Sequence, residues 1–137
     1  MTDGGPTSRP ALINATPQLF VSDIVASCDF FTRVLGFGVE FVYGEPPFYA
    51  QVIRDGASLA LRHVDRPVME KLAEAMKADV DMLAASISVD DVQALYSEFQ
   101  AAGVAFHQGL RAEAWGARTF IVRDPDGNLL LFAGGAD

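Results

Sequence analysis

The chain has little of several features that would narrow its class at once. It has one cysteine, Cys28, so an internal disulfide is excluded. It has no run of about 18 apolar residues, which excludes a helix that spans a bilayer. Ten basic residues stand against eighteen acidic ones, and the net charge of −8 argues against nucleic acid as a partner, because phosphate binding needs clustered lysine and arginine. What remains is 137 residues, half of them apolar, which is enough for the core of one compact domain.

The N-terminal segment lacks the layout of a signal peptide. Residues 1–10 are polar and rich in glycine and proline, with no basic-then-apolar order. We expect residues 1–11 to form a flexible arm, and the lone cysteine fits a reducing cytoplasm. The acidic balance is first a means of staying soluble, and it also favours a cationic ligand in any groove lined with carboxylates.

The second half of the chain is a partial sequence repeat of the first. Val21-Ser22-Asp23-Ile24 opens a helical pattern, and Val89-Asp90-Asp91-Val92 opens another 68 residues later. Arg54-Asp55-Gly56 leads into an apolar strand pattern, as does Arg123-Asp124-Pro125-Asp126-Gly127-Asn128. The offset stays between about 68 and 71, which predicts two copies of one βαβββ unit. Two such units can pair their sheets around a groove.

Periodicity and turn residues place the elements of each unit. We expect units at 12–64 and 82–133, a linker with a short helix at 65–81, and a tail at 134–137. The linker helix is expected to begin just after Pro67. The expected helices cover residues 22–36 and 91–102. The expected strands are 13–21, 39–43, 48–54, 57–63, 83–89, 104–108, 119–123 and 128–133.

These patterns resemble a known superfamily. The duplicated units, the Val-x-Asp helix starts, and Trp115-Gly116-x-Arg118 before the 124–128 turn resemble the vicinal oxygen chelate superfamily. That group includes glyoxalase I, extradiol dioxygenases, fosfomycin-resistance enzymes and bleomycin-resistance proteins. The resemblance implies an α+β fold, with a mixed sheet that lines a groove.

The same resemblance implies where a metal would be held, with one ligand from each of four strands. Those positions are Thr16, Ala60, Ala84 and Leu131. Alanine and leucine offer no donor atom, and a threonine hydroxyl is a poor anchor. A two-residue slip in the first strand gives Gln18, which would stand alone. We therefore expect neither a metal nor a cofactor. His63 and His107 have no partner at metal spacing and are interpreted as surface residues.

Alternation along the strands predicts the face on which a ligand would lie. That face holds small, polar and aromatic side chains, which leave room for a bulky guest. Its expected members are Thr16, Gln18, Phe20, Ser58, Ala60, Arg62, Ala84, Ser86, Ser88, Leu129 and Leu131.

Within the superfamily the chain is most similar to the bleomycin-resistance branch. Thr16-Pro17-Gln18-Leu19 and Glu113-Ala114-Trp115-Gly116 follow its pattern. That branch consists of metal-free, acidic dimers, which exchange an N-terminal strand and hold a cationic antibiotic between subunits. The resemblance implies that Trp115 and Tyr49, or its neighbour Phe48, stack on the ligand. It also implies that Glu40, Glu45 and Glu113 meet its positive charge, with Pro17 at the hinge of the exchanged strand.

Three functions follow from the sequence. The first is a cytoplasmic homodimer that sequesters a cationic or aromatic small molecule, such as a bleomycin-like antibiotic, without metal. The alternative is a metal-dependent glyoxalase- or dioxygenase-like enzyme, which requires a different strand register. A third is a protein that binds another protein through its sheet. An exchanged-strand dimer and a side-by-side dimer both remain open.

Overall fold

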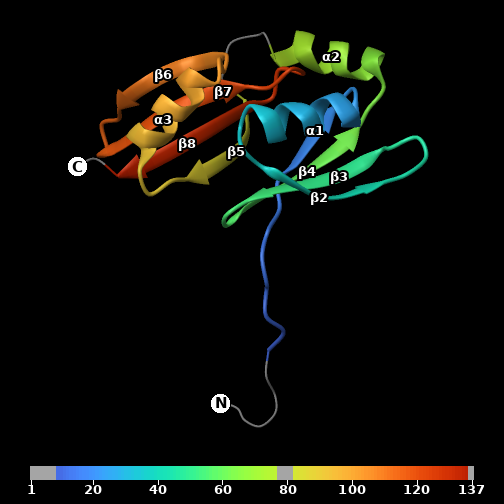
Figure 1. Ribbon diagram of the computed structural model, residues 1–137, viewed down its shortest axis with the longest axis horizontal. Coiled ribbons are helices and arrows are strands. Elements are labelled where there is room, and N and C mark those ends of the chain that lie inside the picture. Colours follow the sequence, from blue (N-terminus) through green and yellow to red (C-terminus); the bar gives the residue numbers. More distant parts are fainter. Residues whose placement is uncertain (1–8, 77–81, 136–137) are drawn as a thin grey trace.

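The two halves of the sequence fold into two similar units. The computed structural model describes residues 9–76 and 82–135, which build two four-stranded sheets (Figure 1). The first sheet contains, in spatial order, β1 (Gln18–Val21), β4 (Ala57–His63), β3 (Tyr49–Arg54) and β2 (Gly38–Tyr43). The second contains β5 (Leu83–Ser88), β8 (Leu129–Gly135), β7 (Ala117–Arg123) and β6 (Phe106–Ala112). In each sheet the first and last strands of the unit pair in parallel and the other pairs are antiparallel, which confirms the predicted α+β class.

The repeated Val-x-Asp motif is a strand end followed by a helix cap. The carboxylate of Asp23 accepts a hydrogen bond from the backbone N–H of Ala26 at 3.1 Å and begins α1 (Ile24–Arg33). Asp91 accepts from Ala94 at 3.0 Å and begins α3 (Val92–Ala101). Such caps satisfy backbone donors that the helix itself leaves unpaired. No helix in the described part of the chain is long and apolar enough to cross a membrane.

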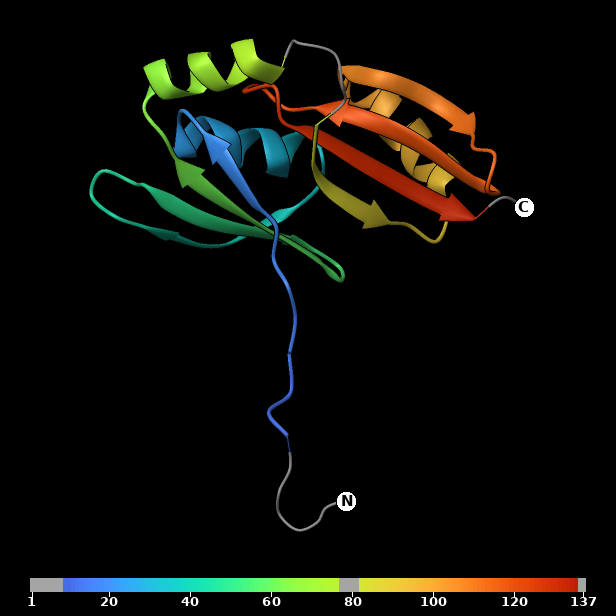
Figure 2. The same cartoon turned by 180° about the vertical axis from the view of Figure 1, so that it is seen from behind.

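The core lies between each helix and one face of its sheet. Phe31 of α1 and Phe99 of α3 are both fully buried, and Phe120 stacks on Phe132 with ring centroids 5.1 Å apart. Burial raises the pKa of the Cys28 thiol, so this cysteine is a packing group. Both helices lie on the same side of the molecule, in front of the strands in Figure 1 and behind them in Figure 2. The opposite faces of both sheets are therefore not covered by α1 or α3.

The first strand is shorter than predicted. It begins at Gln18 rather than at residue 13, and residues 9–17 run away from the body as an extended arm (Figures 1 and 2). Pro17 has no N–H to donate, and its carbonyl accepts from Ala60 at the edge of the sheet. Leu12 is 100% exposed and Ile13 89% exposed, because no strand among the described residues pairs with this part of the arm.

Other boundaries also differ: α1 ends at Arg33 rather than at residue 36, and β7 begins at Ala117 rather than at residue 119. The linker helix α2 (Arg66–Met76) begins before Pro67, which is tolerated there because first-turn N–H groups have no partner within the helix. β6 covers residues 106–112 rather than 104–108, with two register shifts. β8 includes Gly134 and Gly135, which were expected in the tail. Residues 1–8 of the predicted arm, 77–81 of the linker and 136–137 of the tail lie outside the described residues.

A turn of the second unit fastens that unit to the first. The carboxylate of Asp124, which is 3% exposed, accepts hydrogen bonds from the backbone N–H groups of Asp126 and Asn128. Asn128 donates through Nδ2 to Asp124 and to the carbonyl of Phe20, both at 2.9 Å. Asp126 accepts from the backbone N–H of Ser22 at 3.1 Å. We call this contact, of residues 124–128 with residues 20–22, the closed seam.

Burial governs the acid at the centre of the closed seam. Removal from water raises the pKa of Asp124 to about 6, and the nearby charge of Asp126 acts in the same direction. The hydrogen bonds from Asn128 and Asp126 oppose this shift because they favour the carboxylate. Ionisation of Asp124 in the folded chain is therefore less favourable than ionisation of an aspartate in water.

Candidate ligand-binding site

The helix-free face of the first sheet carries two rows of side chains, set by the strand register. The first row runs Phe20, Arg62, Tyr49 and Tyr43 across β1, β4, β3 and β2. The second runs Gln18, Ala60, Gln51 and Phe41 across the same strands. Opposite residues on one face of paired strands stand about 4.5–5.5 Å apart, so each row is continuous.

The aromatic side chains of this face are open to solvent. Phe20 is 42% exposed, Phe41 36% and Tyr43 65%. The ring of Phe41 lies 5.9 Å from each of the rings of Tyr43 and Tyr49, measured between centroids. This face offers flat apolar surface, on which an aromatic ligand can stack.

Polar side chains on the same face form a hydrogen-bonded group around Gln51. Gln51 donates through Nε2 to Glu40 at 2.8 Å and to the hydroxyl of Ser58 at 2.9 Å. Glu40 thus reaches the face through a register shift between Val39 and Phe41, which alternation alone would not have given. Five predicted site residues share this surface: Gln18, Phe20, Glu40, Tyr49 and Arg62.

The loop between β2 and β3 carries two further predicted residues, Glu45 and Phe48. Phe48 is 56% exposed, and its ring lies against Gly44. Gly44 has φ of +103°, and a side chain there would collide with that ring. The glycine is therefore required by both conformation and space. Glu45 is exposed in the same loop.

A second polar cluster lies on the helix-free face of the second sheet. The carboxylate of Glu113, a side chain only 13% exposed, accepts from the hydroxyl of Thr119 at 2.6 Å and from Nε of Arg111 at 3.0 Å. Gln108 donates to Thr119 Oγ1 at 3.1 Å. The hydrogen bond from Thr119, and then that from Arg111, hold the pKa of Glu113 below its usual value. Glu113 is a positioned ion-pair partner rather than an unpaired anion.

Sequence reasoning placed Glu113 in the site and missed the residues that hold it. Arg111 fell outside the strand predicted at 104–108, so its side chain was not assigned to any face. Thr119 is 2% exposed and pairs with both Arg111 and Ala133, in a predicted strand whose outward positions were not considered. The alternation of inward and outward side chains along residues 119–123 would have placed Thr119 on the helix-free face.

Trp115 stands apart from the aromatic rows. It is 76% exposed in the β6–β7 turn, which is closed by a hydrogen bond from the N–H of Gly116 to the carbonyl of Glu113. This turn and the β2–β3 loop lie at opposite ends of the molecule (Figures 1 and 2). One chain therefore does not bring Trp115 beside Phe48 or Glu45.

The four positions implied for a metal do not fit one. The strand register sets Gln18 beside Ala60, and Ser86 beside Leu131, while Thr16 precedes β1 and Ala84 sits at a register shift of β5. Ala60 and Leu131 have no donor atom, so each pair offers at most one weak neutral oxygen. The described residues contain no group of three or more His, Cys, Asp or Glu side chains that could hold a metal. His63 is exposed and lies 3.2 Å from Asp65.

Comparison with known proteins identifies the family. The model described as the Glyoxalase/Bleomycin resistance protein/Dioxygenase superfamily matches residues 13–132. The chain belongs to this superfamily. Among curated proteins none matches.

Solved structures show the same fold. The bleomycin-binding protein of bleomycin-producing Streptomyces verticillus, complexed with copper(II)-bleomycin, is 26% identical with a TM-score of 0.72, over 93% of this chain and 99% of that one. TnmS3, an antibiotic binding protein from Streptomyces sp. CB03234, is 25% identical with a TM-score of 0.63, over 93% and 100%. TioX from Micromonospora sp. ML1 is 24% identical with a TM-score of 0.66, over 86% and 94%, and shows the fold alone.

Proposed function

We propose that this protein binds a cationic or aromatic small molecule, such as a bleomycin-like antibiotic, and releases it chemically unchanged. The observation that carries the proposal is the helix-free face of the first sheet. It presents three exposed aromatic side chains, Phe20, Phe41 and Tyr43, around positions that lack metal donors. A surface of this kind favours stacking over catalysis, because no group there can activate water or polarise a carbonyl through a metal.

The antibiotic-binding relatives support the choice of ligand. The bleomycin-binding and TnmS3 structures are similar to this chain over nearly all their length. The net charge of −8 favours a cationic guest over an anionic one, because a field of one sign raises the local concentration of the opposite charge. Arg62 lies between Phe20 and Tyr49 in the aromatic row, so we place the cation of the ligand away from it, toward Glu40.

A homodimer belongs to the same proposal. Trp115 and the β2–β3 loop can contribute to one groove only if they come from two copies, since they lie at opposite ends of one chain. Both helix-free faces open on the same side of the molecule, where a second copy can cover them (Figure 2). The exposed arm with Leu12 and Ile13 supports exchange of this segment between copies. A cytoplasmic location is likewise proposed, on the ground of the single buried thiol.

Calorimetric titration with metal-free bleomycin tests the binding role. We expect saturable binding, weakened about tenfold in Phe20→Ala through loss of one stacking surface worth about 1.4 kcal/mol. Val25→Ala is the matched control, because Val25 is 66% exposed on the helix side of the same unit. Absence of saturable binding, or equal losses in the two variants, would contradict the proposed site.

A further inference from the structure

The two units meet a second time, and there they leave a cleft. The β3–β4 turn of the first unit faces the junction of β5 and α3, in the arrangement that the closed seam has with β1 and α1. The β3–β4 turn has two residues, 55–56, between the paired Arg54 and Ala57, whereas the β7–β8 turn has five, 124–128, between the paired Arg123 and Leu129. The shorter turn does not fill the space, and a cleft of about 750 Å³ remains. We call this junction, where residues 54–57 and 88–91 line the two sides of the cleft, the open seam.

The cleft has an apolar interior. Core side chains from both units line it, including Phe37, Leu59, Leu95, Phe99 and Phe132. Phe37 is 5% exposed and Phe132 2%, so they belong to the packed core behind the cleft. The half-buried Ile87, Val89 and Leu95 offer the apolar surface inside it. Its volume lies within the range of about 300–1,000 Å³ typical of small-molecule pockets.

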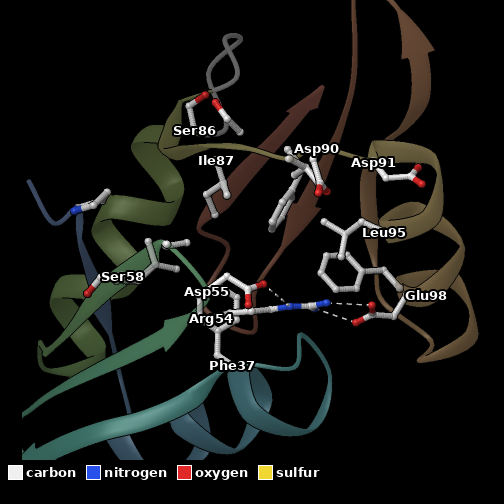
Figure 3. A pocket seen from close by; sticks show the side chains of 18 of the residues that line it. Phe37, Arg54, Asp55, Ser58, Ser86, Ile87, Asp90, Asp91, Leu95 and Glu98 are labelled. Atoms are coloured by element: carbon white, nitrogen blue, oxygen red, sulfur yellow. Dashed lines mark hydrogen bonds and ion pairs between the residues drawn. The ribbon is translucent and has the colours of Figure 1, made fainter. Parts of the chain in front are cut away.

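One ion pair spans the cleft (Figure 3). Arg54 donates from Nη1 and Nη2 to the two carboxylate oxygens of Glu98 at 2.8 and 2.9 Å, and from Nη1 to the carbonyl of Leu35. These hydrogen bonds hold the pKa of Glu98 below its usual value. Arg54 and Glu98 therefore largely neutralise one another at the rim.

The remaining charge at the rim is negative. Asp55, Asp90 and Asp91 line the cleft, and Arg54 is its only cation among the described lining residues. Asp91 caps α3, and Asp55 is 94% exposed with Arg54 Nε at 4.0 Å. No hydrogen bond or ion pair within residues 9–76 and 82–135 engages the carboxylate of Asp90, which is exposed at the rim of the cleft (Figure 3). The positive end of the α3 dipole is offset by Asp90 and Asp91 together.

We propose that this cleft is a second ligand site, which takes a small organic monocation with a flat apolar body. The apolar part lies against Ile87, Val89 and Leu95, which line the cleft and are half-buried, and the cation lies at Asp90. Ser58, Ser86 and Ser88 also line the cleft, and their hydroxyls offer hydrogen-bond acceptors to an ammonium group. The site lies within one chain and uses none of the aromatic rows of the first sheet. It shares Ser58, Ser86 and Ser88 with the ligand face expected from the sequence.

The test uses three probes of one shape and different charge. They are 1-naphthylmethylammonium, 1-naphthalenemethanol and 1-naphthylacetate, titrated into the full chain and followed by backbone amide chemical shifts. We expect saturable shifts at Ala57, Ser88 and Leu95 with the cation. The alcohol should bind at least threefold more weakly and the acetate more weakly still.

Two variants locate the site. Asp90→Asn should weaken binding of the cation about threefold to fivefold, as expected for one exposed ionic contact, while Glu70→Gln removes the same charge on α2 and should change nothing. Ala94→Phe should abolish binding, because Ala94 lines the cleft with an exposed side chain that can be enlarged without disturbing the core.

Several results would overturn the second site. One is shifts that do not saturate, and another is equal affinity for all three probes. A third is shifts confined to the aromatic rows, around Gln51 and Phe20, which would favour the proposed function and refute the cleft. Conversely, bleomycin binding that fails while the naphthyl cation binds at the open seam would refute the proposed function alone.

Discussion

The closed seam and the open seam are two versions of one contact. In the closed seam, residues 124–128 reach the β1–α1 junction, and Asn128 and Asp126 donate or accept hydrogen bonds across it. In the open seam the turn is three residues shorter, and among the described residues it is Arg54 that bridges to α3. The same pairing of a turn with a strand–helix junction is therefore closed by hydrogen bonds in one place and leaves a cleft in the other.

Breaking the closed seam should have the largest effect. Asn128 is 8% exposed and bonds Asp124 and Phe20, so Asn128→Ala leaves a buried carboxylate and a carbonyl short of a donor. We expect the free energy of unfolding to fall by about 2–3 kcal/mol in urea titrations. Asn14→Ala, in the exposed arm, is the control and should stay within about 0.5 kcal/mol of the parent. Equal urea midpoints for Asn128→Ala and the parent would show that the hydrogen bonds of Asn128 do not stabilise the fold.

The pH dependence of the closed seam should have a definite sign. The pKa of Asp124 is raised to about 6 in the folded chain against 3.8 as its usual value, so the folded state holds its proton more tightly. Its contribution to stability is therefore fully present below about pH 4 and is lost as the pH rises to about 6. At about 1.4 kcal/mol per pH unit, the loss amounts to at most about 3 kcal/mol.

The variant Asp124→Asn separates this group from the other carboxylates. Urea titrations at pH 4 and pH 7 give the change in the free energy of unfolding between these pH values for the parent and for the variant. The difference between the two changes is the contribution of Asp124. We expect the parent to lose more stability than the variant between these two values. A parent that gains relative to the variant would mean that the hydrogen bonds outweigh burial.

The open seam should contribute least. Glu98→Gln removes the charge that faces Arg54, but the two side chains are 47% and 29% exposed, so solvent screens their attraction. We expect a loss of about 0.5–1 kcal/mol, reduced at high salt. Asp29→Asn breaks the more exposed pair with Arg33 on α1 and should cost less. If Glu98→Gln lowered the free energy of unfolding as much as Asn128→Ala, the open seam would stabilise the fold as strongly as the closed seam, contrary to this account.

Local signals in the sequence were sufficient for most of the fold. The helices that follow Asp23 and Asp91 and the turn between the strands at Asp55 depend on neighbouring residues, and the structure has all three where the sequence predicts them to within a few residues. The start of β1 was wrong because apolar residues such as Leu12 and Ile13 look like a strand even where no partner strand exists. The extent of β6 was wrong because its two register shifts break the alternation on which strand prediction rests.

The candidate site was predictable where it follows alternation. Gln18, Phe20 and Arg62 lie on the predicted face of the first sheet. The partners of Glu113 were missed because Arg111 and Thr119 meet it only through the shifted pairing of β6 with β7. The cleft at the open seam could not be predicted, since it depends on how two distant segments fit together and not on either alone.

Native mass spectrometry of the protein mixed with metal-free bleomycin tests the central claim most directly. The account predicts a mass of two chains with bound bleomycin, and bleomycin of unaltered mass after release by acid. Ligand that emerges with a changed mass would contradict sequestration and require catalysis. A single chain that binds no bleomycin at saturating concentration would contradict both the groove between copies and the ligand proposed for it.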